Sequence, residues 1–108
     1  MAAKALLIVR AELADPADRP HFDRWYDEEH LREALATFQA DRAWRSWSRI
    51  NPTSHCAFYE FSDVAAARAA LQSEATRWLV AKFDETWGRR VTRTRDVVEV
   101  VQRLPNSG

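Results

Sequence analysis

The spacing of apolar residues changes several times along the chain, and each change predicts a new element. An apolar run with Leu6-Leu7-Ile8-Val9 at its centre extends from Ala5 to Leu13. Its length and β-branched centre are typical of a central strand that is buried on both sides. Asp15-Pro16 ends the run, and because proline suits the first turn of a helix, we expect the first helix to begin near Pro20.

The first predicted helix carries large apolar side chains over a wide surface. At about 100° per residue, one broad sector of this helix holds aromatic and polar side chains together. Its members are Phe22, Tyr26, Glu29, His30 and Glu33, with Trp25 at the edge. Further apolar side chains extend the surface toward the far side, namely Leu31, Leu35 and Phe38. We therefore expect this helix to be covered on more than one side or to bend.

The middle of the chain predicts a β-hairpin. Residues from Arg42 to Ile50 alternate in character, and neither face of this strand is plainly exposed to solvent. Asn51 to Ser54 has the composition of a turn, and the aromatic-rich segment from His55 to Ser62 resumes as a strand.

Two helical segments are predicted after the hairpin. Asp63 is a suitable N-cap for a helix from Val64 to about Gln72. A further helix is expected from Glu74 to Trp87, and Gly88 is expected to end it as a C-terminal cap. The apolar face of this further helix comprises Leu79, Val80, Phe83 and Trp87.

The last predicted element is a long strand from Val91 to Leu104, followed by a frayed tail from Pro105 to Gly108. The order strand, helix, strand, strand, helix, strand is that of the split βαβ or ferredoxin-like fold. We therefore predict one α+β domain, residues 1–108, in which the helices cover one face of a four-stranded antiparallel sheet.

The other face of this sheet is predicted to be apolar. It would carry alternate residues of the strands, including Trp44 or Trp47, Tyr59 and Val97 to Val101. A surface of this kind rarely stays in water, so the pattern predicts a homodimer in which two sheets meet face to face. The chain has five tryptophans and five phenylalanines in 108 residues. This number is large enough to supply aromatic side chains both to the core and to a second buried contact, such as a dimer interface.

Composition argues against several classes of partner. Lysine plus arginine and aspartate plus glutamate number 16 each, so no net field attracts nucleic acid or an anionic membrane. The single cysteine, Cys56, excludes an intramolecular disulfide, and the apolar run after Lys4 is too short for a signal peptide. No apolar run approaches the length of a membrane span. We expect a soluble, cytoplasmic protein.

The main candidate for chemistry is a histidine on the first predicted helix. His30 faces inward, with Tyr26 one turn before it and Glu33 one turn after it, where the carboxylate would hold one imidazole nitrogen. A neutral histidine held in this way moves protons near pH 7, and a tyrosine hydroxyl donates to a developing oxyanion. This group, with Trp25 and Glu29 nearby, suits enolisation, isomerisation or cyclisation of a small carbonyl compound without a cofactor. The alternative is a core histidine that bonds a backbone carbonyl among aromatic residues that only fill the core.

The other histidines and the cysteine are weaker candidates for a functional site. His55 and Tyr59 share a strand face and would line a cavity beside the sheet, but an exposed histidine at the strand edge is the favoured interpretation of His55. His21 and His30 lie about 180° apart on the helix and cannot chelate a metal together, and Cys56 has no partner at zinc spacing. We therefore expect no intrinsic metal site, and a haem held by one histidine is left open.

A basic run near the end of the chain comprises Arg89, Arg90, Arg93 and Arg95, beside Trp87. Basic residues next to an aromatic residue are able to follow a nucleic-acid backbone. Arg93 and Arg95 alternate along a strand, however, and acidic residues elsewhere balance them, which favours surface ion pairs or dimer contacts. No serine or cysteine has the sequence context of a catalytic nucleophile.

Two segments resemble a known group of proteins. Phe22 to Leu31, with its Trp25-Tyr26 pair and Glu29-His30-Leu31, resembles the first-helix signature of EthD-like and related small proteins of the dimeric α+β barrel superfamily. The segment from Trp78 through Trp87-Gly88 to Asp96 is similar to the closing part of uncharacterised members of this group. The resemblance implies two ferredoxin-like subunits with joined sheets, each with a pocket between its sheet and helices.

The resemblance also implies a small-molecule function. The superfamily includes monooxygenases that use no cofactor, polyketide cyclases, lactone isomerases, haem-dependent enzymes and members without known activity. By its position, His30 is the expected pocket residue, and Trp25 and Tyr26 are the expected walls. The chain has Thr37 to Asp41 where many relatives have a Pro-Gly pair, which is a departure at the mouth of the pocket.

We therefore expect a homodimer whose pocket binds an aromatic or carbonyl metabolite. His30, Tyr26 and Glu33 are expected in catalytic roles, with His30 as the acid and base. The expected ligand-binding residues are Trp25, Phe22, Glu29, Tyr59 and His55. The alternatives are a non-catalytic ligand-binding or stress-associated homodimer and a purely structural subunit, and the fold does not decide among them.

Overall fold

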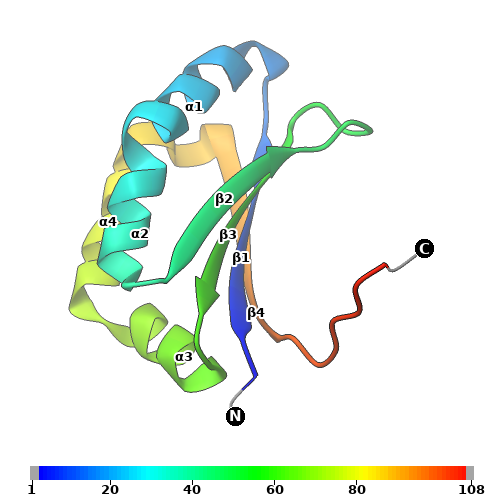
Figure 1. The fold of residues 1–108 in the computed structure, drawn as a ribbon. Helices are drawn as coiled ribbons and strands as arrows, with labels where there is room; N and C mark the ends of the chain where they lie inside the picture. Colours follow the sequence, from blue (N-terminus) through cyan, green and yellow to red (C-terminus); the bar gives the residue numbers. More distant parts are fainter. Residues whose placement is uncertain (1–2, 107–108) are drawn as a thin grey trace.

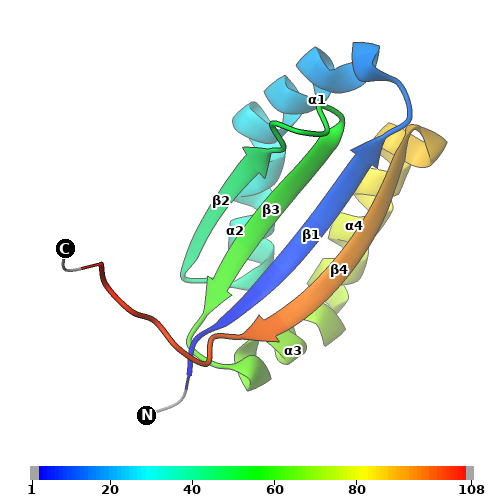
Figure 2. The ribbon, with the colours of Figure 1, turned by 90° about the vertical axis from the view of Figure 1, so that its right-hand side faces the viewer.

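The computed structural model describes residues 3–106, and the order of its elements is the predicted one. Four strands form one antiparallel sheet in the order β2-β3-β1-β4. The strands are β1 (Ala5–Leu13), β2 (Arg42–Trp47), β3 (Ser54–Phe61) and β4 (Val91–Glu99). The helices cover one face of the sheet, and the other face is open (Figures 1 and 2). The predicted ferredoxin-like α+β fold is confirmed.

The helices begin and end close to the predicted residues. After a short 3-10 turn at Pro16–Asp18, helix α1 (Arg19–Trp25) continues through a π-helical turn (Tyr26–His30) into α2 (Leu31–Phe38). The second helical region consists of α3 (Val64–Gln72) and α4 (Glu74–Trp87). Asp63 caps α3 as predicted, because its Oδ1 accepts a hydrogen bond from the backbone N–H of Ala66 at 2.8 Å.

The π turn at Tyr26–His30 follows from the spacing of the buried residues. Its backbone N–H at Leu31 donates to the carbonyl of Tyr26, five residues back. The buried side chains of this helical region recur at every fourth residue, at Phe22, Tyr26, His30, Ala34 and Phe38. In a regular α-helix each such step drifts by about 40°, so the last side chain would lie about 160° from the first. One wider turn removes a large part of this drift and keeps the buried side chains on one face.

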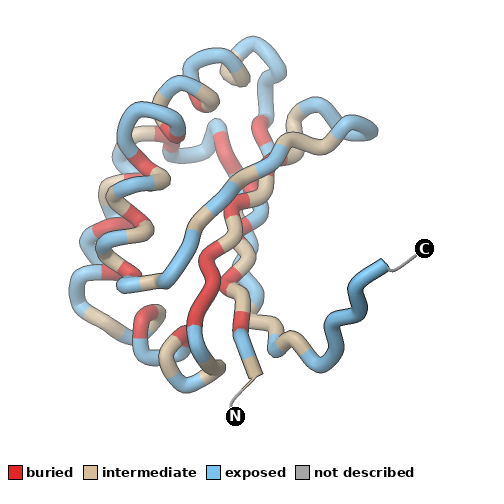
Figure 3. Tube along the Cα trace, in the orientation of Figure 1, coloured by how far each residue is buried: buried red, intermediate tan, exposed pale blue. Residues whose placement is uncertain are grey.

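Strand β1 is buried on one face only. Its odd-numbered residues are buried under the helices, while Leu6 and Ile8 are half-buried and Arg10 and Glu12 are exposed on the open face. The tube in Figure 3 shows the buried residues gathered between the sheet and the helices. The expectation that this strand is buried on both sides is wrong for the chain alone, because no segment within residues 3–106 covers the second face.

The register separates the aromatic residues of the hairpin onto opposite faces. Trp44 pairs with Phe58 on the open face, where the two rings stack with centroids 5.6 Å apart and Trp44 is 41% exposed. Trp47 and Tyr59 instead face the helices, and Tyr59 is buried. The prediction that Tyr59 lies on the open face is therefore wrong, since it is an odd-numbered residue of a strand whose odd positions point to the core.

The last strand is shorter than predicted. Strand β4 ends at Glu99, whereas the sequence predicted a strand to Leu104. Glu99 pairs with Ala5, the first residue of β1, so the register of the two strands ends there, although the backbone N–H of Val100 still donates to the Lys4 carbonyl at 2.9 Å. Residues 100–106 form no regular element, and the last two residues of the predicted tail lie outside the described part of the chain.

Gly88 ends α4 as predicted, and its backbone conformation requires glycine. Its φ is 53° and its ψ is −129°, a combination that residues with a Cβ rarely adopt. A Cβ built on Gly88 meets no atom within 4 Å, so a larger residue would be strained by its backbone and not by a clash.

We expect Gly88→Ala to lower the free energy of unfolding by about 1–3 kcal/mol, because the strained backbone conformation persists in the folded state only. Urea denaturation measures this change. Arg89→Ala, at the exposed neighbouring position, is the matched control and should change stability by less than about 0.5 kcal/mol. Equal midpoints for the two variants would show that the backbone at residue 88 relaxes without cost.

Candidate functional site

His30 lies at the end of the π turn and points inward, as predicted. The residue is only 4% exposed. Its ring stacks on Trp25, with ring centroids 4.3 Å apart and an angle of 14° between the planes, and contacts the rings of Tyr26 at 4.8 Å and Phe83 at 5.5 Å. Among these three rings, Trp25 alone is partly exposed. The imidazole is therefore held by aromatic rings and separated from solvent by one of them.

Glu33 does not hold His30. Its Oε2 accepts from the ammonium group of Lys82 on α4 at 2.8 Å, and Glu29 binds the same ammonium group at 2.8 Å. Within residues 3–106, the Nδ1 atom of His30 and the Oε1 atom of Glu33 are buried without a hydrogen-bond partner. The predicted Glu33–His30 hydrogen bond is thus absent, because Lys82 offers the carboxylate a full positive charge, which a neutral imidazole lacks.

His30 is neutral at physiological pH. Burial lowers its pKa from 6.5 to about 4, the charges of Arg93 and Lys82 act in the same direction, and Glu29 opposes them. The alternative interpretation of His30 is a core residue bonded to a backbone carbonyl, and among the described residues Nδ1 makes no such bond. A neutral imidazole with a free buried nitrogen is chemically able to bind or move a proton.

His55 is fully buried, so the favoured interpretation of it as an exposed residue at the strand edge is wrong. It pairs with Ala11 of β1 and with Trp47 of β2, and the ring of Phe22 covers it at a centroid distance of 5.1 Å. The turn before β3 suggested exposure, but the strand is an interior one and α1 crosses above its first residues. Burial and the charge of Arg45 lower the pKa of His55 to about 3.

A polar group that the sequence did not predict connects α1 with the hairpin. The guanidinium of Arg45 donates to Asp23 Oδ1 at 2.8 Å and to the Asp23 carbonyl at 3.2 Å, and its NH1 lies 3.4 Å from His55 Nε2. The indole N–H of Trp47 donates to the same Oδ1 at 2.7 Å, and this hydrogen bond, with Arg45, lowers the pKa of Asp23. Alternation in β2 placed Arg45 and Trp47 on one face, but nothing in the pattern identified Asp23 as their shared partner.

Tyr26 lies between the two buried histidines. Its ring centroid is 4.8 Å from that of His30 and 4.5 Å from that of His55. Its hydroxyl also interacts with that of Tyr59 in a hydrogen bond that lowers the pKa of Tyr26 and raises that of Tyr59, as expected when Tyr59 donates. Burial is nevertheless the largest effect and raises the pKa of both tyrosines, so both hydroxyls keep their protons near pH 7.

Six of the eight predicted site residues therefore gather between α1 and the sheet. They are Phe22, Trp25, Tyr26, His30, His55 and Tyr59. Glu29 and Glu33 lie apart from them, bound to Lys82. The space beside His30, which was expected to be a pocket, is filled by the rings of this group.

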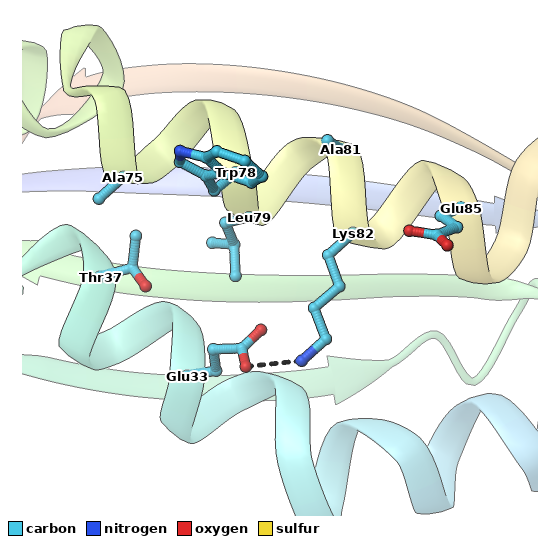
Figure 4. Close-up of a pocket in the computed structure, with 8 residues that line it drawn as sticks. All are labelled: Glu33, Thr37, Ala75, Trp78, Leu79, Ala81, Lys82 and Glu85. Carbon is cyan, nitrogen blue, oxygen red and sulfur yellow. Dashed lines mark hydrogen bonds and ion pairs between the residues drawn. The ribbon is translucent and has the colours of Figure 1, made fainter.

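The larger hollows of the structure lie elsewhere. A groove of about 590 Å³ runs between α2 and α4, and Figure 4 shows the Glu33–Lys82 ion pair within it. Its lining residues are Glu33, Thr37, Ala75, Trp78, Leu79, Ala81, Lys82 and Glu85. A second hollow, of about 330 Å³, lies at the start of α1 beside Asp23 and Trp47.

The ion pairs, the possible metal ligands and the helices of the described residues show which of the expected partners the structure supports. Arg93 binds Asp84 at 2.7 Å and Arg90 lies 3.6 Å from Asp18, so these two arginines of the basic run form the ion pairs that were favoured. Residues 3–106 contain no group of three or more potential ligands arranged to hold a metal ion. No helix in this range has the length and hydrophobicity needed to cross a membrane.

The buried histidines predict an acid-sensitive fold. Both have a pKa near 6.5 in the unfolded chain and about 4 or 3 in the folded chain, so the unfolded chain takes up protons first as the pH falls. The two neutral histidines therefore contribute their full stabilisation of the folded chain above pH 6.5. This contribution is lost as the pH falls from about 6.5 toward 4. We expect the free energy of unfolding to decrease by a few kcal/mol over this window.

Urea denaturation at pH 7.5, 6.5, 5.5 and 4.5 checks this expectation. His30→Gln should reduce the slope against pH, because it removes one of the two groups, whereas His21→Gln, at an exposed position on α1, should leave it unchanged. A free energy of unfolding that stays constant from pH 7.5 to 4.5 would contradict the expectation.

Comparisons with known proteins support the fold. No family model and no curated protein sequence matches the chain. A variant of SnoaB, a cofactor-independent oxygenase from Streptomyces nogalater, has a similar structure at 20% identity, with 97% of this chain and 100% of that chain covered and a TM-score of 0.67. An EthD family protein from Bacillus halodurans matches at 12% identity, over 84% and 96% of the two chains, with a TM-score of 0.61.

A dimeric ferredoxin-like protein from an uncultured marine organism is also similar. Its identity is 14%, the alignment covers 94% of this chain and 99% of that chain, and the TM-score is 0.56. At these identities the similarity shows the fold. The chain thus has the ferredoxin-like fold of these proteins.

Proposed function

We propose that this chain is a small-molecule enzyme that removes a proton from an aromatic or carbonyl-bearing metabolite, with His30 as the base. The observation that carries the proposal is the neutral His30 imidazole, which is buried in a ring of aromatic side chains and has a free Nδ1 atom. Its position in a π turn supports the proposal, because single π turns within α-helices are frequent at functional sites. The similar fold of a cofactor-independent oxygenase agrees with this type of enzyme.

The reaction types considered for this chain share one first step. Isomerisation, cyclisation and cofactor-independent oxygenation of a carbonyl compound each begin with loss of a proton from carbon or oxygen. His30 Nδ1 accepts this proton, and the Tyr26 hydroxyl, which stays protonated, donates a hydrogen bond to the oxygen on which negative charge develops. Trp25 is the partly exposed residue of this group, so a compound that reaches His30 has to displace this ring.

Exchange of carbon-bound hydrogen for deuterium tests the proposal without knowledge of the natural substrate. A panel of small aromatic ketones and hydroxyaromatic ketones is incubated with the protein in D2O, and proton NMR follows loss of signal next to the carbonyl. We expect exchange above the buffer rate for at least one compound, and an oxygen electrode then shows whether the same compound is oxidised. If no compound exchanges faster than in buffer, the proposed enzyme is rejected in favour of a binding protein.

A non-catalytic ligand-binding homodimer is the second candidate. It is favoured by the groove of about 590 Å³ between α2 and α4, which is lined by the exposed Trp78 but not by His30. In that case a ligand should bind with equal affinity to the wild-type protein and to a His30 variant, and Trp78→Ala, in the lining of the groove, should weaken its binding.

We further propose that a second copy of the chain covers the open face of the sheet. This face carries the half-buried Leu6, Ile8, Phe58 and Val98 and the partly exposed Trp44. A similar structure is described as a dimeric ferredoxin-like protein. Apolar surface of this kind on a sheet is commonly covered by association.

Sedimentation velocity at micromolar concentration should show a dimer. Phe58→Glu should weaken association by more than tenfold, because burial of an unpaired carboxylate costs several kcal/mol. Trp78→Glu, on the helix side and 73% exposed, is the control and should leave the dimer intact. A wild-type protein that sediments as a monomer would refute the proposed association.

A further inference from the structure

The segment that follows β4 carries two exposed apolar side chains. Val101 is 88% exposed and Leu104 is 79% exposed. The backbone N–H of Val100 still donates to the Lys4 carbonyl at 2.9 Å, but residues 101–105 make no hydrogen bond or ion pair within residues 3–106. We call residues 101–105 the arm.

The arm leaves the sheet on its open side. Figure 1 shows it beyond the end of β4, on the side of the sheet opposite to the helices, where it runs away from the strands. This is the side on which a second copy of the chain has been proposed to lie. The arm therefore points toward the place of the second copy and not back onto its own strands.

The spacing of the two apolar residues suits a segment that packs on a surface. Leu104 precedes Pro105, and a residue before proline is restricted to extended conformations. In extended backbone of the polyproline II type, which has three residues per turn, residues three positions apart project to the same side. Val101 and Leu104 have this spacing, so we expect one side of the arm to be apolar.

The open face offers an aromatic surface for such a segment. The ring of Trp44 stacks on that of Phe58 with an angle of 12° between the planes, and Trp44 is 41% exposed. Among the described residues of the four strands, Trp44 is the only large apolar residue that is exposed. Proline-rich segments in the polyproline II conformation bind to surfaces lined by aromatic rings. The Trp44–Phe58 pair is therefore the part of the open face that matches the arm.

We propose that the arm of each copy packs on the open face of the other copy, where Val101 and Leu104 contact the rings of Trp44 and Phe58. The inference rests on the proposed association of two copies through this face. Because a two-fold interface uses the same surfaces of both copies, the arms are exchanged and each dimer contains two such contacts. The exchange removes the apolar side of both arms and the exposed part of both Trp44 rings from water, which stabilises the dimer and has no counterpart in the monomer.

Removal of the arm tests the exchange. A chain that ends at Val100 keeps the hydrogen bonds of the described sheet, so its far-UV circular dichroism should be unchanged. Sedimentation velocity over a concentration series should show the dissociation constant of its dimer raised by at least about tenfold, since four buried apolar side chains per dimer are lost. A wild-type dimer that truncation leaves equally stable would overturn the inference and keep the proposed association, whereas a wild-type monomer would refute both.

Two charge substitutions on the arm provide a matched pair. Leu104→Glu places a carboxylate against the aromatic rings of the other copy and should weaken the dimer by at least about tenfold. Gln102→Glu adds the same charge two residues away on another side of the arm, and should change the dissociation constant by less than about threefold, as contacts at an interface rim do. Equal effects of the two substitutions would indicate a general repulsion of charge and would overturn the proposed contact.

A disulfide between two different chains tests where the arm lies. Cys56 is half-buried on the open face, two residues before Phe58 on β3 and about 7 Å from it. Wild-type protein is mixed with a size-tagged chain that carries Cys56→Ser and Leu104→Cys, so a disulfide of the combined size joins position 104 of one copy to Cys56 of the other. We expect this product under mild oxidation, and little of it when Trp78→Cys, on the helix side and 73% exposed, replaces Leu104→Cys in the tagged chain.

Absence of the mixed disulfide would overturn the inference. Leu104→Cys in a chain that keeps Cys56 then shows where the arm lies instead. An intrachain disulfide in that chain, which migrates as a monomer without reductant, would place the arm on its own sheet.

Discussion

Replacement of His30 by glutamine is expected to slow deuterium exchange by about 10²–10⁴-fold, the usual contribution of a positioned acid or base. Glutamine keeps a polar group of similar length but is unable to take up the proton. The imidazole is 4% exposed and packed on Trp25, so its replacement also removes a ring contact. The measurement is the rate of signal loss in D2O for the compound that responds best to the wild-type protein.

His21→Gln is the matched control for this experiment. His21 belongs to the same helix, but it is exposed and lies on the outside of the candidate site. The His21 ring contacts Trp87 and not His30, so its replacement should leave the exchange rate within about twofold of the wild-type rate. If the two variants exchange equally fast, His30 is a residue of the core and not the base.

Truncation of Phe22 is expected to produce the largest loss of stability. This ring is fully buried at the centre of the aromatic cluster between α1 and the sheet. The rings that it contacts belong to Trp25, Tyr26, Trp47, His55, Phe83 and Trp87. Phe22→Ala should therefore lower the free energy of unfolding by about 3–5 kcal/mol, through lost burial and the cavity that remains.

Chemical denaturation at pH 7.5 measures the effect of Phe22→Ala. Ile50→Ala is the control, because Ile50 is 96% exposed in the hairpin turn and its truncation should change stability by less than about 0.5 kcal/mol. A Phe22→Ala protein with the midpoint of the control would mean that the surrounding rings close the cavity completely.

The fold was predictable because several local signals agree. The apolar run of β1, the cap at Asp63 and the stop at Gly88 each mark a boundary that the structure reproduces. Where a boundary depends on a partner far along the chain, local pattern was insufficient. The valines after Glu99 continue a strand pattern, but β1 begins at Ala5, and its pairing with β4 ends at Glu99.

The candidate site was only partly predictable, for the same reason. Helical spacing placed Tyr26 and His30 together, because both belong to one helix. The burial of His55 depends on two strand pairings and one helix crossing, none of which is visible in the residues around it. Lys82 lies 49 residues from Glu33, and the sequence between them contains no sign that the two side chains meet.

The wide turn at Tyr26–His30 has a consequence for chain length. Relative to regular α-helical winding, the helix holds one residue too many between Phe22 and Phe38, and the exposed acidic run Asp27-Glu28-Glu29 accommodates the surplus. Loss of one acidic residue there would bring His30 to three positions after Tyr26, which in an ordinary helix is the same inward side. A shortened protein would thus keep the same inward-facing side chains on a regular α-helical backbone. Its rate of proton exchange would separate the contribution of the imidazole from that of the irregular turn.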